Sequence, residues 1–367
     1  MLYENPFTPS FGEIPAHLAG RRTIVADLER AFSGTARRPE LTSLFSGARG
    51  VGKTTLLSLL ANKAQENGWV AVSTTALPGM LDDIEIGLKR NARHLLEPEP
   101  KKKLAGVEIS SLGSLSFESS EPQKSNWRYR MTDILDVLQE SNIGVVITVD
   151  EVDPSLDELI ELAAVFQHFV REGYKVSLLM AGLSHNVSSL LSNKTVSFLR
   201  RAQHYKLGRI AGYDVKDALG RTIRENGREI NDDALDLAVQ GIDGFPFLMQ
   251  LVGYRSWDMS LDSQLISAED VVKGLELGKA ELEDRILEAT FRELSPEDIR
   301  FVVAMLEDEG DSRISDIVTR LERSPAQVSQ YRRRLIDAGV IGERSRGVVG
   351  FDLPYFRDYL VSRVVSI

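Results

Sequence analysis

The stretch GARGVGKTT, residues 47–55, decides how this chain folds. It matches the pattern G-x-x-x-x-G-K-[ST], with Gly47, Gly52, Lys53 and Thr54 at the specified positions. The apolar run LTSLFSG (41–47) precedes the loop and predicts a buried strand, and helical periodicity begins directly after the glycines. Strand, glycine-rich loop and helix in this order predict a phosphate-binding loop, whereas a chance glycine-rich turn would lack that context.

Each residue type in this loop has a chemical reason. Glycines let successive main-chain N–H groups face phosphate oxygens, and the following helix N-terminus adds partial positive charge. Lys53 can reach the β- and γ-phosphates, and the Thr54 hydroxyl is placed to bind Mg²⁺. The predicted ligands are therefore ATP or ADP with Mg²⁺, and the predicted contacts are Gly47, Ala48, Arg49, Gly50, Val51, Gly52, Lys53, Thr54 and Thr55.

A second stretch, VVITVDE (145–151), places two carboxylates at the end of an apolar strand. A carboxylate there can hold a metal ion beside the phosphate loop, and its neighbour can polarise an attacking water. We therefore predict that Asp150 shares the Mg²⁺ site with Thr54 and that Glu151 acts on the water. Asp-Glu pairs are common on protein surfaces, so this prediction depends on the phosphate loop upstream.

The composition and the element pattern predict an α/β protein with additional domains. The chain has 367 residues, which favours two or three domains, and it has no cysteine, which excludes disulfides and thiolate metal sites. Without an 18-residue apolar run or a signal pattern, we expect a cytoplasmic protein that does not enter membranes. Strands alternate with helices up to about residue 210, which predicts a doubly wound parallel sheet. Residues 97–125, dense in Pro, Ser, Gly and Lys, predict an exposed insertion.

The two motifs resemble the Walker A (47–55) and Walker B (150–151) elements of AAA+ ATPases, and the likeness extends over nearly the whole chain. The resemblance implies an AAA+ core over 1–211, a helical lid over 212–292 and a winged helix-turn-helix domain over 293–367. It also implies that Arg21 lies near the adenine, that Ser184 or His185 is the sensor-1 residue, and that Arg200 or Arg201 reaches a neighbour's γ-phosphate in a homo-oligomer. The alternative for these arginines is a solvated helix end, which the helix dipole favours.

One departure concerns the lid. In AAA+ lids a sensor-2 arginine usually follows a G-x-x turn, but GFPFLMQL (244–251) has Phe247 there. The Gly-x-Pro arrangement instead resembles STAND ATPases and the bacterial and archaeal relatives of origin-initiator ATPases. This resemblance implies a nucleotide-gated switch with slow hydrolysis. The simpler alternative is that the phenylalanines are lid core.

The C-terminal region carries a basic cluster in a chain whose net charge is -10. Residues 312–346 contain eight arginines against four acidic residues, a local charge of +4. Three predicted helices and a glycine-punctuated hairpin resemble a winged helix-turn-helix, whose third helix enters the DNA major groove. Because Gln pairs with adenine and Arg with guanine or phosphate, the predicted contacts with double-stranded DNA are Gln327, Gln330, Arg333, Arg334, Arg344 and Arg346.

Two functions remain open from the sequence. The first is an ATP-dependent DNA-binding ATPase, and the second is a STAND-like signalling switch whose winged helix binds a protein partner. The acidic run EDEGD (307–311) would repel a duplex, and the three consecutive arginines 332–334 point in different directions around a helix. A metabolic P-loop kinase is excluded, because the chain shows no acceptor-substrate site and a lid with a winged helix does not belong to that class.

Overall fold

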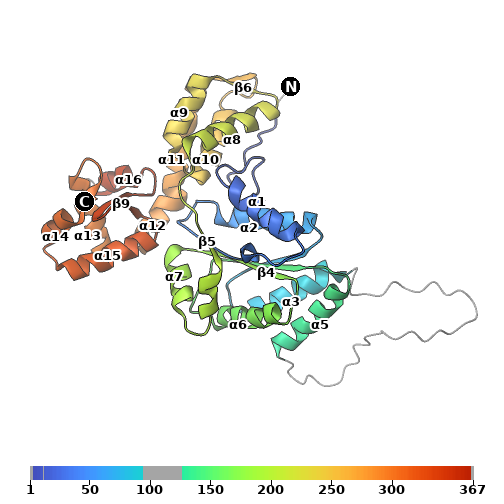
Figure 1. The fold of residues 1–367 in the computed structure, drawn as a ribbon. Helices are drawn as coiled ribbons and strands as arrows, with labels where there is room; N and C mark the ends of the chain where they lie inside the picture. Colours follow the sequence, from blue (N-terminus) through green and yellow to red (C-terminus); the bar gives the residue numbers. More distant parts are fainter. Residues whose placement is uncertain (1–2, 11, 94–125, 365–367) are drawn as a thin grey trace, which may run out of the picture.

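A five-stranded parallel sheet forms the centre of the molecule (Figure 1). The computed structural model describes residues 3–10, 12–93 and 126–364; the predicted insertion at 97–125 lies outside this range. The strands are β1 (Thr42–Ser46), β2 (Val70–Thr75), β3 (Val145–Asp150), β4 (Val176–Gly182) and β5 (Gln203–Lys206). Their spatial order is β2-β3-β4-β1-β5, so the chain crosses over between neighbouring strands and confirms the doubly wound prediction.

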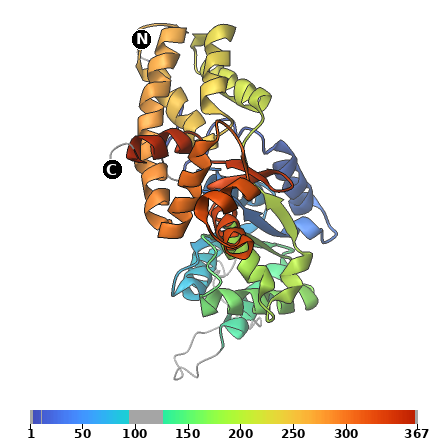
Figure 2. The same cartoon turned by 90° about the vertical axis from the view of Figure 1, so that its left-hand side faces the viewer.

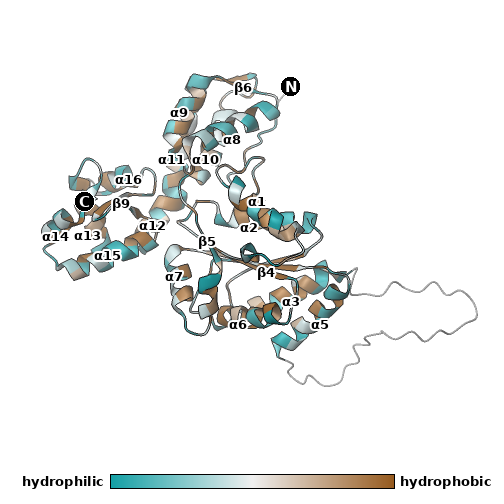
Figure 3. Cartoon of the chain, in the orientation of Figure 1, coloured by the Kyte–Doolittle hydropathy of each residue, from teal (hydrophilic) through white to brown (hydrophobic). Residues whose placement is uncertain are grey.

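Helices cover both faces of this sheet and enclose two hydrophobic cores. One core includes α1 (Arg22–Ser33) and α2 (Lys53–Glu66), and the other includes α3 (Met80–Asn91), α5 (Trp127–Glu140), α6 (Asp157–Arg171) and α7 (Ser184–Ser192). Both faces of β3 and β4 are covered, which explains why these strands read as continuous apolar runs rather than alternating ones. Colouring by hydropathy shows apolar residues along the sheet and the helix faces that meet it (Figure 3).

The next region is helical, with one addition that the sequence did not predict. It contains α8 (Gly212–Glu225), α9 (Asp232–Ile242), α10 (Pro246–Asp258) and α11 (Ala268–Leu282). Two two-residue strands, β6 (Glu229–Ile230) and β7 (Leu265–Ile266), pair in parallel between them. Pairing over two residues is too short to produce an alternating pattern. A π-turn (Glu283–Leu287) then interrupts the last long helix before α12 (Glu288–Glu293), where the sequence predicts one continuous helix.

Residues 296–364, here named the C-terminal unit, pack four helices against a small sheet. The helices are α13 (Pro296–Ala304), α14 (Ile314–Leu321), α15 (Pro325–Asp337) and a final α16 (Phe356–Val364). The hairpin β9 (Ile341–Ser345) and β10 (Val348–Phe351) was predicted, and β8 (Ser312–Arg313) adds a third, antiparallel strand. Capping boxes at Ser295 and Ser324 begin α13 and α15. Each serine side chain accepts a hydrogen bond from the N3 main-chain N–H, and the N3 side chain accepts one from the serine main-chain N–H.

The C-terminal unit lies beside α7 and below the long helices α10 and α11 (Figures 1 and 2). In Figure 1 the chain begins near β6 and ends in the C-terminal unit, and both ends are far from α3, α5 and α6. Within residues 3–10, 12–93 and 126–364, none of the helices has both the length and the apolar character needed to cross a membrane.

Candidate nucleotide-binding site

The Walker A loop joins β1 to α2 in a conformation that requires glycine. Gly50 and Gly52 have φ values of +76° and +86°, in the left-handed region that other residues rarely adopt. A Cβ added to Gly47 would lie 2.4 Å from the carbonyl oxygen of Leu207. Helix α2 begins at Lys53 without a side-chain cap and without an acidic residue in its first turn. Its N-terminal N–H groups and partial positive charge therefore suit an anion such as phosphate.

Lys53 is buried at the base of this loop. Its Nζ donates hydrogen bonds to the carbonyl oxygens of Gly47 (3.1 Å) and Ala48 (2.9 Å), and only 6% of the residue is exposed. Burial lowers the pKa of Lys53, while the nearby carboxylates of Glu151 and Asp150 act in the opposite direction. A partly desolvated ammonium interacts more strongly with an anion than one in bulk water does. The position and burial of the Lys53 ammonium therefore suit phosphate binding.

The predicted metal ligands lie next to one another. The hydroxyl of Thr54 donates a hydrogen bond to the Asp150 carboxylate at 2.5 Å. Asp150 is the last residue of β3, where its register partner on β2 is Thr75. Glu151 follows with a φ of +52°, a strained conformation for a residue other than glycine, and its N–H donates to Asp150 (2.9 Å).

This hydroxyl–carboxylate pair fits Mg²⁺. Magnesium prefers oxygen ligands, and it is usually held by one or two carboxylates, waters and substrate phosphates rather than by a protein cage. Among the described residues, no group of three or more His, Cys, Asp or Glu side chains could hold a metal by itself. Thr54 and Asp150 would therefore hold the ion together with the phosphates, which is the arrangement that the sequence predicts.

Three consecutive residues of the Walker A loop each contact a segment much later in the chain. A Cβ added to Gly339, at the end of α15, would lie 2.3 Å from Cβ of Ala48. Arg49 forms an ion pair with Glu293 at 2.6 Å. A Cβ added to Gly50 would lie 2.7 Å from the Phe245 ring. None of these contacts has a local signal in the sequence, so sequence reasoning missed all three.

A cavity of about 580 Å³ opens between the Walker A loop, α7 and the C-terminal unit. Ser184, the first residue of α7, lines it together with Gly47 and Ala48. Asp337 and Asp352 of the C-terminal unit form another part of its wall. The predicted sensor-1 residue Ser184 is thus beside the phosphate loop, whereas His185 is absent from the residues that line this cavity.

Comparison with solved structures identifies the fold. The Walker-type ATPase PABY2304 of Pyrococcus abyssi superposes with a TM-score of 0.66 at 16% identity, covering 94% of this chain and 96% of that one. The ORC2 protein of Aeropyrum pernix, in ADPNP–ADP complexes, gives 0.67 at 14% identity and covers all of both chains. Cdc6p from Pyrobaculum aerophilum gives 0.52 at 14% identity, covering 99% and 100%.

This chain has the AAA+ α/β fold of these solved proteins. The resemblance noted in the sequence is confirmed at the level of the fold, which is what likeness at these identities shows. One family model, a domain of unknown function (DUF8462), matches residues 284–360, from the π-turn to α16. No curated protein matches the chain.

Arg21, which is predicted to lie near the adenine, forms hydrogen bonds with main-chain oxygens. Its guanidinium donates to the carbonyl oxygen of Gly208 at 2.7 Å and lies 3.5 Å from those of Gly20 and Val51. Only 9% of the residue is exposed, and this burial lowers its pKa although Asp214 acts in the opposite direction. Arg21 therefore ties the AAA+ core's Walker A loop to the segment after β5 through main-chain contacts.

The two arginine-finger candidates lie at the end of a short 3-10 helix, Ser197–Arg201, before β5. Both are exposed. The Nε of Arg200 donates to the carbonyl oxygen of Leu191 at 2.9 Å, which fixes this side chain against the end of α7. Action on the nucleotide of a neighbouring AAA+ subunit stays a prediction for Arg200 and Arg201.

The residues predicted to bind DNA divide into two groups. Gln327 accepts hydrogen bonds from Ser324 in the capping box of α15, Arg334 pairs with Asp298 at 2.7 Å, and Arg344 pairs with Asp352 at 2.8 Å. These three side chains stabilise the C-terminal unit itself. By contrast, Gln330 and Arg346 are exposed, and Arg333 is exposed with only a distant (3.8 Å) carboxylate at Asp337.

Proposed function

We propose that this protein is an ATP-binding AAA+ ATPase that couples Mg-ATP binding and slow hydrolysis to DNA binding through its C-terminal unit. The ATPase part of the proposal is supported by one observation: buried Lys53 and the hydrogen-bonded pair Thr54–Asp150 lie together at one edge of the sheet. The A. pernix ORC2 protein, which has this fold, was solved in complexes with ADPNP and ADP.

Each residue of the site has a role in this proposal. Lys53 neutralises charge on the β- and γ-phosphates, while Thr54 and Asp150 hold Mg²⁺. The bound ion supplies charge neutralisation on the phosphate oxygens. Glu151, exposed at the rim, orients a water molecule and accepts its proton. Hydrolysis is slow because Phe247 replaces the lid arginine and the candidate fingers Arg200 and Arg201 need a second subunit.

The DNA-binding part depends on the exposed face of α15 and on the β9–β10 hairpin. The element order α13, β8, α14, α15, β9, β10 resembles that of a winged helix-turn-helix, in which the third helix enters the major groove. Gln330 and Arg333 on α15 and Arg346 at the hairpin tip carry polar or charged groups on exposed positions. Arginines of this kind add affinity through phosphate contacts that weaken with salt.

A second candidate function is a STAND-like switch whose C-terminal unit binds a protein partner. One observation favours it: three of the six predicted DNA contacts, Gln327, Arg334 and Arg344, are engaged within the unit. This leaves a smaller positive surface than the sequence suggests. The two candidates share the nucleotide site and differ in the ligand of the C-terminal unit.

The first experiment tests the nucleotide site. ATP binding to the wild type and to Lys53→Ala is measured by calorimetry with Mg²⁺. Loss of a charge-assisted contact weakens binding by about tenfold or more. Equal affinity of the two proteins would refute the site assignment.

The second experiment separates the two outputs. Fluorescence anisotropy of a labelled random duplex is followed with the Glu151→Gln protein, with ATP, with ADP and without nucleotide, at two salt concentrations. We expect salt-sensitive binding that depends on nucleotide and is lost in Arg333→Glu/Arg346→Glu. The control Arg90→Glu/Arg171→Glu makes the same charge change at exposed positions of the AAA+ core and should bind as the parent does. Duplex binding in no state would favour the protein-binding switch.

A further inference from the structure

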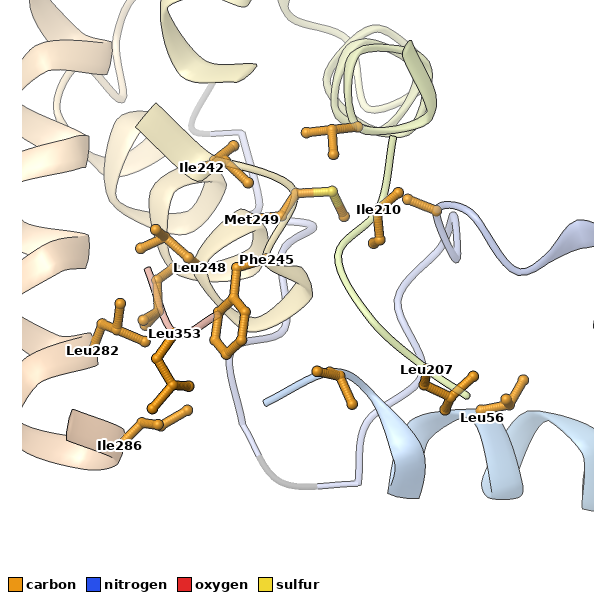
Figure 4. Packing of buried hydrophobic residues seen from close by; sticks show 14 of the residues in the cluster. Leu56, Leu207, Ile210, Ile242, Phe245, Leu248, Met249, Leu282, Ile286 and Leu353 are labelled. Atoms are coloured by element: carbon orange, nitrogen blue, oxygen red, sulfur yellow. The ribbon is translucent and has the colours of Figure 1, made fainter. Parts of the chain in front are cut away.

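We propose that Phe245 is a positioning residue for the Walker A loop and that the C-terminal unit, through Leu353, holds Phe245 in place. The inference rests on the proposed nucleotide site and names an additional determinant of its affinity. Phe245 directly precedes α10, in the G-F-P-F stretch of residues 244–247. Its ring packs on Gly50 of the phosphate loop, and Figure 4 shows the ring pointing toward Leu353 of the C-terminal unit.

The first contact is between the Phe245 ring and Gly50. A Cβ added to Gly50 would lie 2.7 Å from Cζ and 2.8 Å from Cε1 of the ring, so the edge of the ring is packed directly on the main chain of the loop. Gly50 has a φ of +76°, and its carbonyl oxygen accepts a hydrogen bond from the Phe247 N–H at 3.2 Å. The beginning of α10 therefore supports Gly50 by one apolar and one polar contact.

The second contact supports the ring itself. Phe245 is 2% exposed, and it lies in one cluster with Ile286 of the π-turn and Leu353 of the C-terminal unit. Figure 4 shows the ring of Phe245 directed toward these two side chains. Cδ1 of Ile286 would also lie 2.8 Å from a Cβ on Gly50, so the π-turn reaches the loop as well. Removal of the Leu353 side chain would leave space beside the ring.

The position of Leu353 is fixed by polar contacts on both sides of it in the chain. The guanidinium of Arg209, from the segment after β5, donates to the carbonyl oxygen of Asp352 at 2.9 Å. The hydroxyl of Tyr355 donates to the carbonyl oxygen of Gly241 at 2.5 Å, and the ammonium of Lys279 lies over the Tyr355 ring at 4.2 Å. The segment that carries Leu353 is thus joined to both the AAA+ core and the lid.

A chain of contacts therefore leads from the C-terminal unit to the loop that binds phosphate: Leu353 to Phe245 to Gly50. Packed side chains resist small displacements, because a ring that moves away from its neighbours loses dispersion contacts that nothing replaces. A ring that is free to move away from Gly50 no longer stabilises the left-handed conformation that the phosphate site requires. The affinity for ATP is thereby coupled to the placement of the C-terminal unit.

The test compares ATP affinity, measured by calorimetry with Mg²⁺, in the full-length wild type and in variants. We expect Phe245→Ala and Leu353→Ala to weaken ATP binding by about five- to tenfold, the usual size of a coupling between sites. Phe245→Met, which refills most of the volume with a flexible apolar chain, should recover most of the affinity. Arg209→Gln, which removes a polar contact without creating a cavity, should weaken binding in the same direction.

The matched control is Ile317→Ala. Ile317 is fully buried in α14 of the C-terminal unit, and α14 packs against α13, α15 and β8 of that unit. It should lower the melting temperature as Leu353→Ala does and leave the affinity for ATP unchanged. Equal affinities for wild type and Leu353→Ala, or an equal loss in Ile317→Ala, would overturn the inference while the nucleotide site stands. Failure of the wild type to bind ATP would instead overturn the proposed function.

Discussion

The hydroxyl of Thr54 donates a hydrogen bond to the carboxylate of Asp150, although 96 positions of sequence separate the two residues. Thr54 lies in the first turn of α2, and Asp150 ends β3, which is separated from β1 by β4. In a parallel sheet the carboxyl ends of all strands meet at one edge, and ligands bind there. The pair therefore marks the place where Mg²⁺ would be held.

Replacing Thr54 by valine should remove the contribution of Mg²⁺ to ATP binding. Valine keeps the shape of threonine but has no hydroxyl, so Asp150 alone would hold the ion. We expect ATP to bind the variant with nearly the same affinity with and without Mg²⁺, whereas the wild type binds more tightly with it. Calorimetric titrations in magnesium and in EDTA give both values.

The control for this change is Thr148→Val, two residues before Asp150 on β3. Thr148 is buried, with 2% of its surface exposed, and lies within β3 between Ser73 of β2 and Leu179 of β4. Its variant should keep the magnesium dependence of the wild type. A Thr54→Val protein that still responds fully to Mg²⁺ would show that the hydroxyl is no ligand.

Replacing Glu151 by glutamine should separate binding from hydrolysis. The amide cannot accept a proton from water, and loss of a general base typically slows a reaction by about 100-fold or more. We expect phosphate release to fall by that order while ATP affinity stays within about twofold of the wild type. Glu161→Gln, the same change at an exposed position of α6, serves as the control. Undiminished turnover in the Glu151 variant would assign the base to another residue.

The sequence was sufficient to predict the parts of the site that depend on local patterns. Strand, glycine loop and helix follow one another between residues 41 and 66, and the apolar run before Asp150 is buried as a central strand. Periodicity and glycine spacing encode these features directly. The third helix of the C-terminal unit was predicted for the same reason, because Ser324, Pro325 and Gly339 mark its ends.

Other features depend on contacts between distant segments and have no local signal. The resemblance predicts Arg21 near the adenine, but it does not predict that the Arg21 guanidinium donates a hydrogen bond to the carbonyl oxygen of Gly208. Arg334 and Arg344 likewise form ion pairs with Asp298 and Asp352 of the C-terminal unit itself, which their places in the sequence do not indicate. The three successive contacts of Ala48, Arg49 and Gly50 were also beyond prediction, since they require the placement of the lid and the C-terminal unit.

Among the arginines of α15, Arg334 should matter for stability and Arg333 should not. The guanidinium of Arg334 pairs with Asp298, of which only 5% is exposed, and it lies 5.0 Å from the Tyr331 ring. Arg334→Ala leaves this buried carboxylate without its charged partner, a change that costs about 1–3 kcal/mol of unfolding free energy. Arg333 is 78% exposed, so Arg333→Ala should stay within about 0.5 kcal/mol of the wild type.

Urea unfolding followed by circular dichroism measures both values. A duplex-binding assay on the same proteins completes the comparison, because the proposal expects Arg333→Ala to reduce DNA binding without a loss of stability. Equal stability of the two variants would mean that the Arg334–Asp298 pair contributes nothing.

The last prediction concerns acid. Hydrogen bonds from Arg320, which donates to both carboxylate oxygens of Asp308 at 2.6 and 2.7 Å, lower the pKa of Asp308 from 3.8 to about 2. A carboxylate whose pKa is lower in the folded state adds stability above its unfolded pKa and loses it as the pH falls through the folded pKa. Asp308→Asn should therefore melt at a lower temperature than the wild type at pH 5 to 7. The difference should shrink between about pH 4 and pH 2, as the wild-type carboxylate takes up its proton. Thermal melts across this range test the prediction against Asp262→Asn, the same change at an exposed position of the lid, and a difference that persists undiminished at low pH would contradict it.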